Sequence, residues 1–155
     1  MGYFKFISFF VLAHVVSYTI AGVIALAISK DIYESDSRHC DFLRDMSNPD
    51  ESKRVSIYFL PAQVIRGFLM AMVLLPLLSA IVKFSFIESF VFFAGIMFIY
   101  THLAAVSPFI DNIEGQVYFK EDYLVKKYFL KFQFEMVIYV IIFASAMTYI
   151  IRFLS

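Results

Sequence analysis

Tryptophan is missing from this sequence, and cysteine occurs only once, as Cys40, among 155 residues. A single cysteine excludes a disulfide bond within the chain. Acceptor sites for N-glycosylation are missing too, because neither Asn48 nor Asn112 has Ser or Thr two positions later. There is no excess of basic charge, since 13 Lys and Arg balance 13 Asp and Glu. The chain therefore lacks the basic surface by which proteins bind nucleic acid.

Charge is nearly missing from four long stretches, about 4–28, 57–82, 84–106 and 128–154. Apolar residues make up 61% of the chain, whereas soluble domains contain roughly 45–50%. Each stretch is long enough for a membrane-spanning helix of about 20 residues and too long for a barrel strand of about 9–11. Lipid offers no partner to unpaired backbone groups. The sequence predicts an all-α fold, an integral membrane four-helix transmembrane bundle, antiparallel, which forms a single domain over 1–155 with two polar loops on one side.

The first apolar stretch has one alternative interpretation, a secretory signal peptide. Ala25-Leu26-Ala27 has the small residues of a cleavage site. The apolar run extends from Phe6 to about Ser29, however, and is longer than the roughly 7–15 residues usual for a signal peptide. We therefore expect this stretch to be retained as a membrane span.

The orientation of the bundle is predicted from Lys and Arg alone, because these residues are enriched in cytoplasmic loops. Nine of them lie in the polar segments and at the start of the fourth stretch: Lys30, Arg38, Arg44, Lys53, Arg54, Lys120, Lys126, Lys127 and Lys131. Three lie on the opposite side: Lys5, Lys83 and Arg152. We expect loops 30–56 and 107–127 to be cytoplasmic and both termini to lie outside the cell (plasma) membrane. The first loop is also rich in acidic residues, which weakens the signal.

Arg66 is the strongest local signal for a site, because a charged side chain inside a span costs roughly 2.5–3.5 kcal/mol at mid-bilayer. Glu135 is the matching acid in the fourth stretch. Both residues lie within a few turns of the predicted cytoplasmic end. Together with three further polar residues they predict one cluster at the cytoplasmic mouth: Gln63, Arg66, Thr101, His102 and Glu135.

The partners of the two charged residues stay open at this point. Arg66 has three alternatives: an ion pair with Glu135, extension of its long side chain to the lipid headgroups, or a bound ligand or lipid. Glu135 has a competing partner in Lys131, four residues earlier on the same helix face. Two small-residue pairs, Ala21 with Ala25 and Gly67 with Ala71, fit the spacing of closely packed membrane helices.

Two histidine patterns raise the question of a cofactor. His14 and His102 lie on different stretches at different depths, so they do not suit the two axial positions of one haem. His39-Cys40-Asp41 has ligand chemistry, but no second cluster completes a tetrahedral set. We expect no cofactor, no bound metal and no catalytic residue.

The polar loops carry two further features that the sequence interprets as structural. Asp111 and Glu114 are close carboxylates, but we expect an exposed turn there, without the closed pocket that acid–base catalysis needs. We expect Gly115 to serve the backbone conformation. In the first loop, Asp50 or Ser52 is the predicted cap of a short helix leading into the second stretch.

The leading functional hypothesis is a non-enzymatic binding, transport or accessory subunit that acts through helix contacts. The alternative is a lipid-active membrane enzyme with a site around Arg66, His102 and Glu135. A channel is disfavoured because the outer halves of two stretches are nearly all apolar, over 69–78 and, apart from Tyr139, over 137–143. The expected partners are the lipid bilayer, anionic lipid headgroups near Lys126, Lys127 and Lys131, and a protein partner or second copy. Nucleic acid is not expected.

Overall fold

A computed structural model describes residues 1–107 and 109–154, and in this part of the chain it contains helices and no strand. Four helical segments are long and apolar enough to cross a membrane: Tyr3–Ile28, Pro49–Ile81, Phe86–Leu103 and Lys126–Phe153. The all-helical prediction and the count of four such helices are therefore confirmed. The third predicted stretch, 84–106, stops before Pro108, because proline has no backbone N–H to donate; Pro108 lies outside the described residues.

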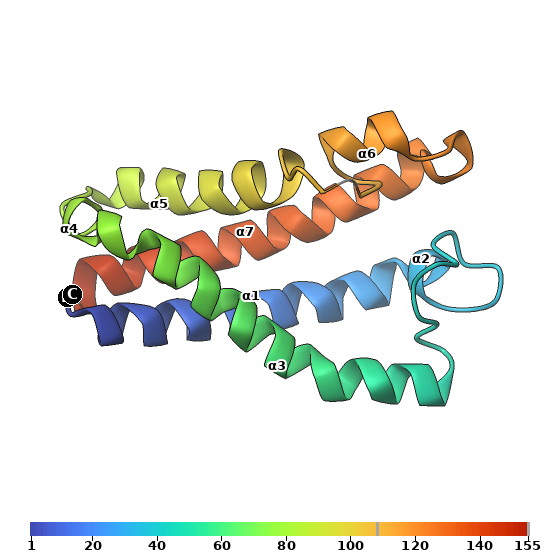
Figure 1. Ribbon diagram of the computed structural model, residues 1–155, viewed down its shortest axis with the longest axis horizontal. Helices are drawn as coiled ribbons and strands as arrows, with labels where there is room; N and C mark the ends of the chain where they lie inside the picture. The colour runs from blue at the N-terminus through green and yellow to red at the C-terminus, as the bar shows by residue number, and fades with distance from the viewer. Residues whose placement is uncertain (108, 155) are drawn as a thin grey trace.

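The described part of the chain contains ten helical elements, of which seven make up these segments and three lie in the connections between them. The ten are α1 (Tyr3–Ile28), α2 (Lys30–Tyr33), α3 (Pro49–Leu74), η1 (Leu75–Leu77), α4 (Leu78–Ile81), α5 (Phe86–Gly95), η2 (Ile96–Leu103), α6 (Ile113–Tyr118), η3 (Glu121–Tyr123) and α7 (Lys126–Leu154). Figure 1 shows α1, α3, α5 and α7 as the long rods of one elongated molecule. Both termini lie at one end with the α4–α5 turn, and the connections that contain α2 and α6 lie at the other. We call the end that contains α2 and α6 the polar end.

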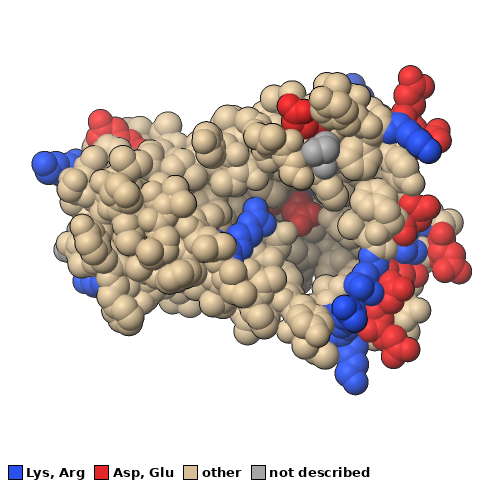
Figure 2. Space-filling model, in the orientation of Figure 1, with Lys and Arg blue, Asp and Glu red and all other residues tan. Residues whose placement is uncertain are grey.

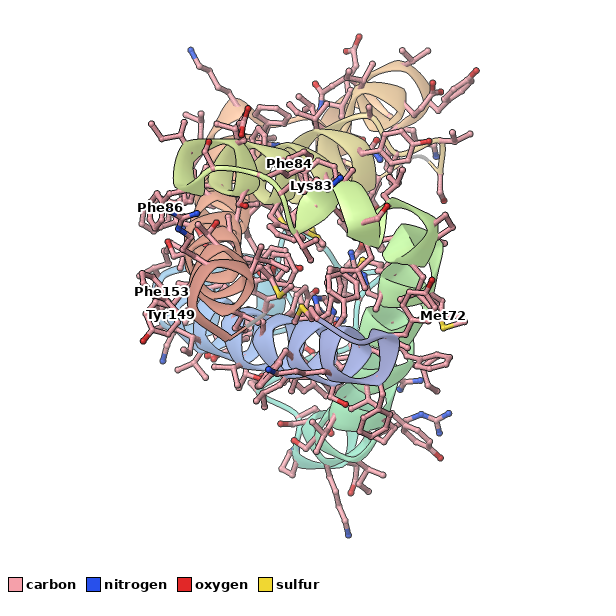
Figure 3. The ribbon with its side chains drawn as sticks, turned by 90° about the vertical axis from the view of Figure 1, so that its left-hand side faces the viewer. Met72, Lys83, Phe84, Phe86, Tyr149 and Phe153 are labelled. Carbon is pink, nitrogen blue, oxygen red and sulfur yellow. The ribbon has the colours of Figure 1, made fainter. Side chains whose placement is uncertain are left out.

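Charge follows this division of the molecule. Figure 2 shows most Lys, Arg, Asp and Glu side chains of the visible face gathered at the polar end, while the body is almost free of them. Figure 3 views the opposite end, where Met72, Phe86, Tyr149 and Phe153 point outward from their helices. These four side chains are exposed in the isolated chain. Exposed apolar groups around a charge-free body are what lipid-facing helices present.

The start of α3 differs from the prediction. The helix begins at Pro49 and not near residue 57, and its cap is Asn48, not Asp50 or Ser52. The Asn48 side chain accepts hydrogen bonds from the backbone N–H groups of Asp50 at 3.0 Å and Glu51 at 3.3 Å. Pro49 favours this start, because proline at the first helical position loses no hydrogen bond. The first polar loop is therefore shorter than expected. The charged residues from Asp50 to Arg54, which were expected in the loop, lie in the first two turns of α3.

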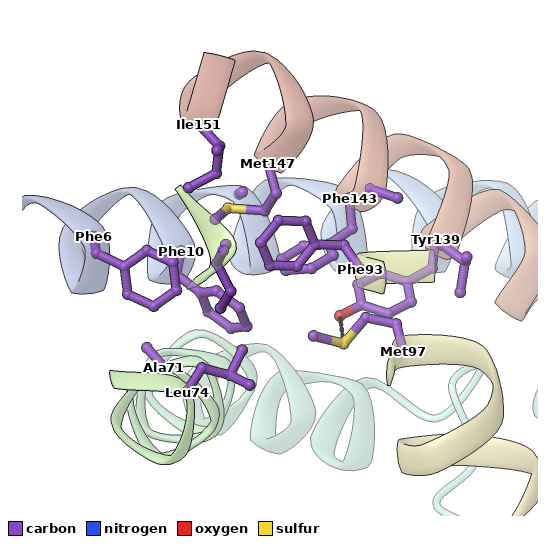
Figure 4. Close-up of a cluster of buried hydrophobic side chains, with 14 of the residues drawn as sticks. Phe6, Phe10, Ala71, Leu74, Phe93, Met97, Tyr139, Phe143, Met147 and Ile151 are labelled. Carbon is purple, nitrogen blue, oxygen red and sulfur yellow. Dashed lines mark hydrogen bonds between the residues drawn. The ribbon is translucent and has the colours of Figure 1, made fainter. Parts of the chain in front are cut away.

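The main core lies between the long helices on the side of the termini (Figure 4). Phe6 and Phe10 of α1 meet Phe93 of α5 and Phe143 of α7 there. The rings of Phe10 and Phe143 pack edge to face with centroids 5.0 Å apart. Such edge-to-face pairs are the preferred arrangement of aromatic rings. This core ties α1, α5 and α7 together at the end of the molecule that carries the termini.

Helices α1 and α3 cross at Gly67. A Cβ atom at Gly67 would lie 3.1 Å from Cδ2 of His14 and 3.3 Å from the Cα of Val11, so the two backbones approach closely. Ala71, one turn on, is fully buried, and the other predicted small pair, Ala21 and Ala25, is buried as well. Both small-residue pairs thus lie on packed helix faces, as their spacing predicts.

The polar end has a second, smaller core. Its fully or largely buried members are Ile32, Cys40, Ile110 and Phe132, drawn from both polar loops and from α7. The first loop is therefore packed and not simply solvated. Burial raises the pKa of the Cys40 thiol to about 11, so this cysteine stays protonated at neutral pH and is a structural, unreactive residue.

Asp31, in α2, forms ion pairs with Lys127 and Lys131 of α7. These ion pairs make the stability of the polar end depend on pH. Burial acts to raise the pKa of Asp31, but hydrogen bonds from Lys127 and Lys131 outweigh it and hold the pKa below the ordinary 3.8. A lowered carboxylate pKa contributes stability that is present above pH 3.8 and is lost as the pH falls below it. We expect Asp31→Asn to cost about 0.5 kcal/mol at neutral pH, the scale of a partly exposed ion pair.

The measurement for Asp31 is detergent unfolding between pH 3 and 7. The mutant curve should meet the wild-type curve at the acid end. Asp36→Asn, an exposed acid of the same loop, is the control and should follow the wild type throughout. A constant gap between Asp31→Asn and wild type across the pH range would contradict the ion-pair account.

Candidate functional site

A cavity of about 400 Å³ lies between α1, α3 and α7 near the polar end. Helices α1 and α3 diverge from their crossing toward this end (Figure 1), and side chains of both line the cavity. Its lining is mainly apolar and aromatic, with a few polar groups: Tyr18, Gly22, Ala25, Leu26, Tyr33, Leu43, Arg44, Met46, Val55, Phe59, Gln63 and Glu135. Figure 2 shows this face hollowed, with an acidic side chain inside and a basic one at the edge. We call it the α1–α3–α7 cavity.

Glu135 is the acidic member of the cavity lining. One of its oxygens accepts a hydrogen bond from the Tyr33 hydroxyl at 3.0 Å. Neither partner considered from the sequence pairs with this carboxylate, because no ion pair joins Glu135 to Arg66 or to Lys131 within the described residues. Lys131 instead donates to Asp31 and to the carbonyl of Ile28 at 3.1 Å.

Arg66 lies beside the cavity and not across it. Its guanidinium is 5.6 Å from the centroid of the Tyr18 ring, a cation–π distance. Tyr18 itself lines the cavity together with Glu135, so Arg66 reaches the edge of the cavity through this ring. Of the alternatives left open by the sequence, the structure shows Arg66 over the Tyr18 ring and Glu135 bonded to the Tyr33 hydroxyl.

A buried histidine connects the cavity to the centre of the molecule. His14 is fully buried, and its Nε2 lies 3.1 Å from the Oε1 of Gln63 while its Nδ1 lies 2.7 Å from the Tyr139 hydroxyl. Because the Gln63 oxygen only accepts, Nε2 is the donor, and in a neutral ring Nδ1 then accepts from Tyr139. The Tyr139 oxygen also lies 3.3 Å from the sulfur of Met97. This chain of contacts joins α1, α3, α7 and η2, and we call it the His14 junction.

His102 and Thr101 lie elsewhere. The Nε2 of His102 is 3.2 Å from the Oε1 of Gln133, and its Nδ1 is 3.8 Å from a carboxylate oxygen of Asp111. Gln133 in turn donates to the backbone carbonyl of Asp111 at 2.6 Å. The Thr101 hydroxyl donates to the Met97 carbonyl on its own helix at 2.9 Å. These contacts fix the end of η2 against α7 and the second polar loop.

Asp111 corrects the expectation of an exposed turn, because the residue is buried. Burial raises the pKa of Asp111, and the neighbouring His102 acts in the opposite direction. Glu114 is half-buried on α6 and does not share this contact. Asn112 holds the turn together by accepting from the Gly115 N–H at 2.7 Å and donating to the Ser107 carbonyl at 2.8 Å.

The five residues predicted to form one cluster are therefore divided. Gln63 and Glu135 line the α1–α3–α7 cavity, and Arg66 lies beside it through Tyr18. His102 belongs to the Asp111–Gln133 contact, and Thr101 lies in an apolar groove between α3 and η2. Segment η2 is a π-helix, in which each turn takes an extra residue. This rotates Thr101 and His102 away from the positions that an α-helical pattern predicts.

The possible metal ligands of the first loop have separate protein partners. The Nε2 of His39 donates to the Tyr123 carbonyl at 3.0 Å, and the ring stacks on Tyr128 at 3.9 Å. Asp41 accepts from the Tyr123 hydroxyl at 3.0 Å, while Cys40 points into the small core. Within 1–107 and 109–154 no three His, Cys, Asp or Glu side chains converge as a metal site would require.

Comparisons of the chain with known protein families, with curated proteins and with solved structures find no match. The α1–α3–α7 cavity is the feature of the described chain that combines a hollow with polar side chains in the apolar body.

Proposed function

We propose that the protein is a non-enzymatic, membrane-embedded binding protein whose α1–α3–α7 cavity holds the polar part of a membrane amphiphile or other small ligand. The observation that carries the proposal is a cavity of about 400 Å³ with a carboxylate, Glu135, among mainly apolar walls. Pockets for small molecules have volumes of roughly 300–1,000 Å³ and combine apolar walls with a few oriented polar groups. Clefts between the helices of a bundle are a usual place for them.

We propose an antiparallel transmembrane arrangement for the four long helices. The 29–48 and 104–125 connections would then lie in the cytoplasm, and both termini outside the plasma membrane. The supporting observations are the nine Lys and Arg residues in and beside these connections and the almost charge-free body in Figure 2. In this orientation the cavity lies in the cytoplasmic half of the bilayer, within reach of lipid headgroups.

Binding is favoured over catalysis by the separation of the predicted acid–base groups. A lipid-active enzyme of the predicted kind needs Glu135 and His102 beside the same substrate. Glu135 lines the cavity, whereas both ring nitrogens of His102 face Gln133 and Asp111. Glu135 and His102 therefore lie at different places in the described structure.

Filling the cavity tests the proposal. Gly22 lines the cavity, and a Cβ atom there meets nothing within 4 Å, so Gly22→Phe places a ring in the space without a clash at its root. We expect at least about tenfold less ligand to copurify, because an occupied pocket cannot also hold a ligand. Native mass spectrometry of protein released from mild detergent measures the bound species.

Gly95→Phe is the matched control. Gly95 also has open space around its Cβ position, but it lies in a groove between α5 and α7, away from the cavity. This variant should retain the ligand. Equal copurification in both variants would contradict binding in the α1–α3–α7 cavity, and a chemically altered lipid after incubation with wild type would support the enzyme.

A further inference from the structure

Glu135 has more capacity to accept hydrogen bonds than the protein uses. A carboxylate offers about four acceptor positions on its two oxygens. The Tyr33 hydroxyl is the one hydrogen-bond donor to Glu135 within the described residues. A carboxylate that is withdrawn from water is costly unless a cation or further donors approach it. Glu135 lines the cavity, so a ligand held there could supply further donors.

Two basic residues near Glu135 are directed elsewhere. Lys131 binds Asp31 and the Ile28 carbonyl, and Arg66 lies over the Tyr18 ring. A ligand that carries an N–H-bearing cation therefore supplies donors that these two residues do not. A ligand with only negative charge would meet repulsion from Glu135 and leave the carboxylate without its donors.

The lining of the same cavity also contains a cation, Arg44, on the loop between α2 and α3. Arg44 makes no ion pair or side-chain hydrogen bond with the residues that the structure describes. A guanidinium binds phosphate or carboxylate with two parallel hydrogen bonds. One cavity thus offers an acceptor for a cation and a donor for an anion.

We infer that the α1–α3–α7 cavity selects a ligand with an ammonium group beside an anionic group, Glu135 binding the ammonium and Arg44 the anion. The inference rests on the proposed binding function and names its ligand class. Two sources share this chemistry, the headgroup of an ethanolamine phospholipid and a free zwitterion such as phosphoethanolamine. A choline headgroup has a cation but no N–H, so it satisfies Glu135 less well.

The experiment uses the full chain in nanodiscs of phosphatidylcholine that contain either phosphatidylethanolamine or phosphatidylglycerol. Native mass spectrometry measures the lipid that stays bound, and a second arm titrates free phosphoethanolamine in detergent by thermal shift. We expect wild type to retain phosphatidylethanolamine over the other two lipids, or to bind free phosphoethanolamine if the source is soluble. Glu135→Gln should weaken this binding roughly tenfold or more, because it leaves the ammonium unpaired.

Two further variants keep the result interpretable. Glu114→Gln removes a half-buried acid outside the cavity and should bind like wild type. Tyr33→Phe removes the hydrogen bond to Glu135 but keeps its charge, so preference for the ammonium should persist. Equal retention of phosphatidylglycerol, or unchanged binding in Glu135→Gln, would overturn the ligand class. Binding that survives Gly22→Phe would instead overturn the cavity function itself.

Discussion

Gly115→Ala is expected to destabilise the polar end by about 3 kcal/mol, the upper range for forcing an extra methyl group into a packed site. An ideal Cβ atom at Gly115 would clash with the carbonyl oxygen and the carbonyl carbon of Phe109. Both are backbone atoms, so no flexible side chain can move aside. The change would force α6 away from the turn at 109–112, and with it the Asn112 bonds that hold this turn.

The measurement for Gly115→Ala combines detergent unfolding with hydrogen exchange across residues 104–125. Exchange should rise in this segment and not in the main core. Gly22→Ala is the control, because its Cβ atom meets nothing within 4 Å and alanine favours a helix over glycine by roughly 0.5–1 kcal/mol. A Gly115→Ala protein as stable as wild type would show that the turn and α6 do not pack as the structure has them.

Gly115 also shows what the sequence could not reveal. Its predicted role was a special backbone conformation, but no glycine in the described chain has a positive φ angle. Gly115 is needed because another backbone segment passes close to it. The two segments are near in sequence, but only the folded turn brings the Phe109 carbonyl against the helix, and no residue pattern signals that approach.

The membrane helices were predictable because length and lack of charge are local properties of the chain. Their ends were less predictable, as α3 shows. Lys53 and Arg54 look like loop residues by hydropathy, yet they lie in the first two turns of the helix. The Asn48-Pro49 pair decides the start through capping and a fixed backbone angle. Asn48 as the cap and Pro49 at the first helical position would together have predicted that α3 starts at residue 49.

The candidate site was predictable only in part. Sequence reasoning found Gln63, Arg66 and Glu135 because polar side chains in apolar stretches are few. It missed Tyr33, since this partner of Glu135 lies 102 residues away in a loop that was expected to be solvated. It also missed the cavity. The small pair at Gly67 and Ala71 indicates where α1 and α3 approach, but the divergence of the two helices beyond the crossing has no local signal.

His14→Leu is expected to lower the stability of the bundle by about 2 kcal/mol, because Gln63 and Tyr139 would each lose a hydrogen-bond partner and a buried polar group left unsatisfied costs roughly 1–3 kcal/mol. Leucine has a similar size, so the close contact with Gly67 would still be filled. Unfolding in mixed micelles measures the loss. Tyr139→Phe should cost less, about 1 kcal/mol, since hydrogen bonds between membrane helices are individually modest.

The double mutant His14→Leu/Tyr139→Phe separates a specific bond from general packing. If the Nδ1–hydroxyl contact at 2.7 Å stabilises the junction, the two single losses should exceed the loss of the double mutant by about 1 kcal/mol. Tyr149→Phe on the exposed face of α7 is the control and should leave stability unchanged. Strict additivity of the two changes would mean that the contact between His14 and the Tyr139 hydroxyl does not stabilise the junction. Side-chain packing in the main core would then hold α1 against α7 without this bond.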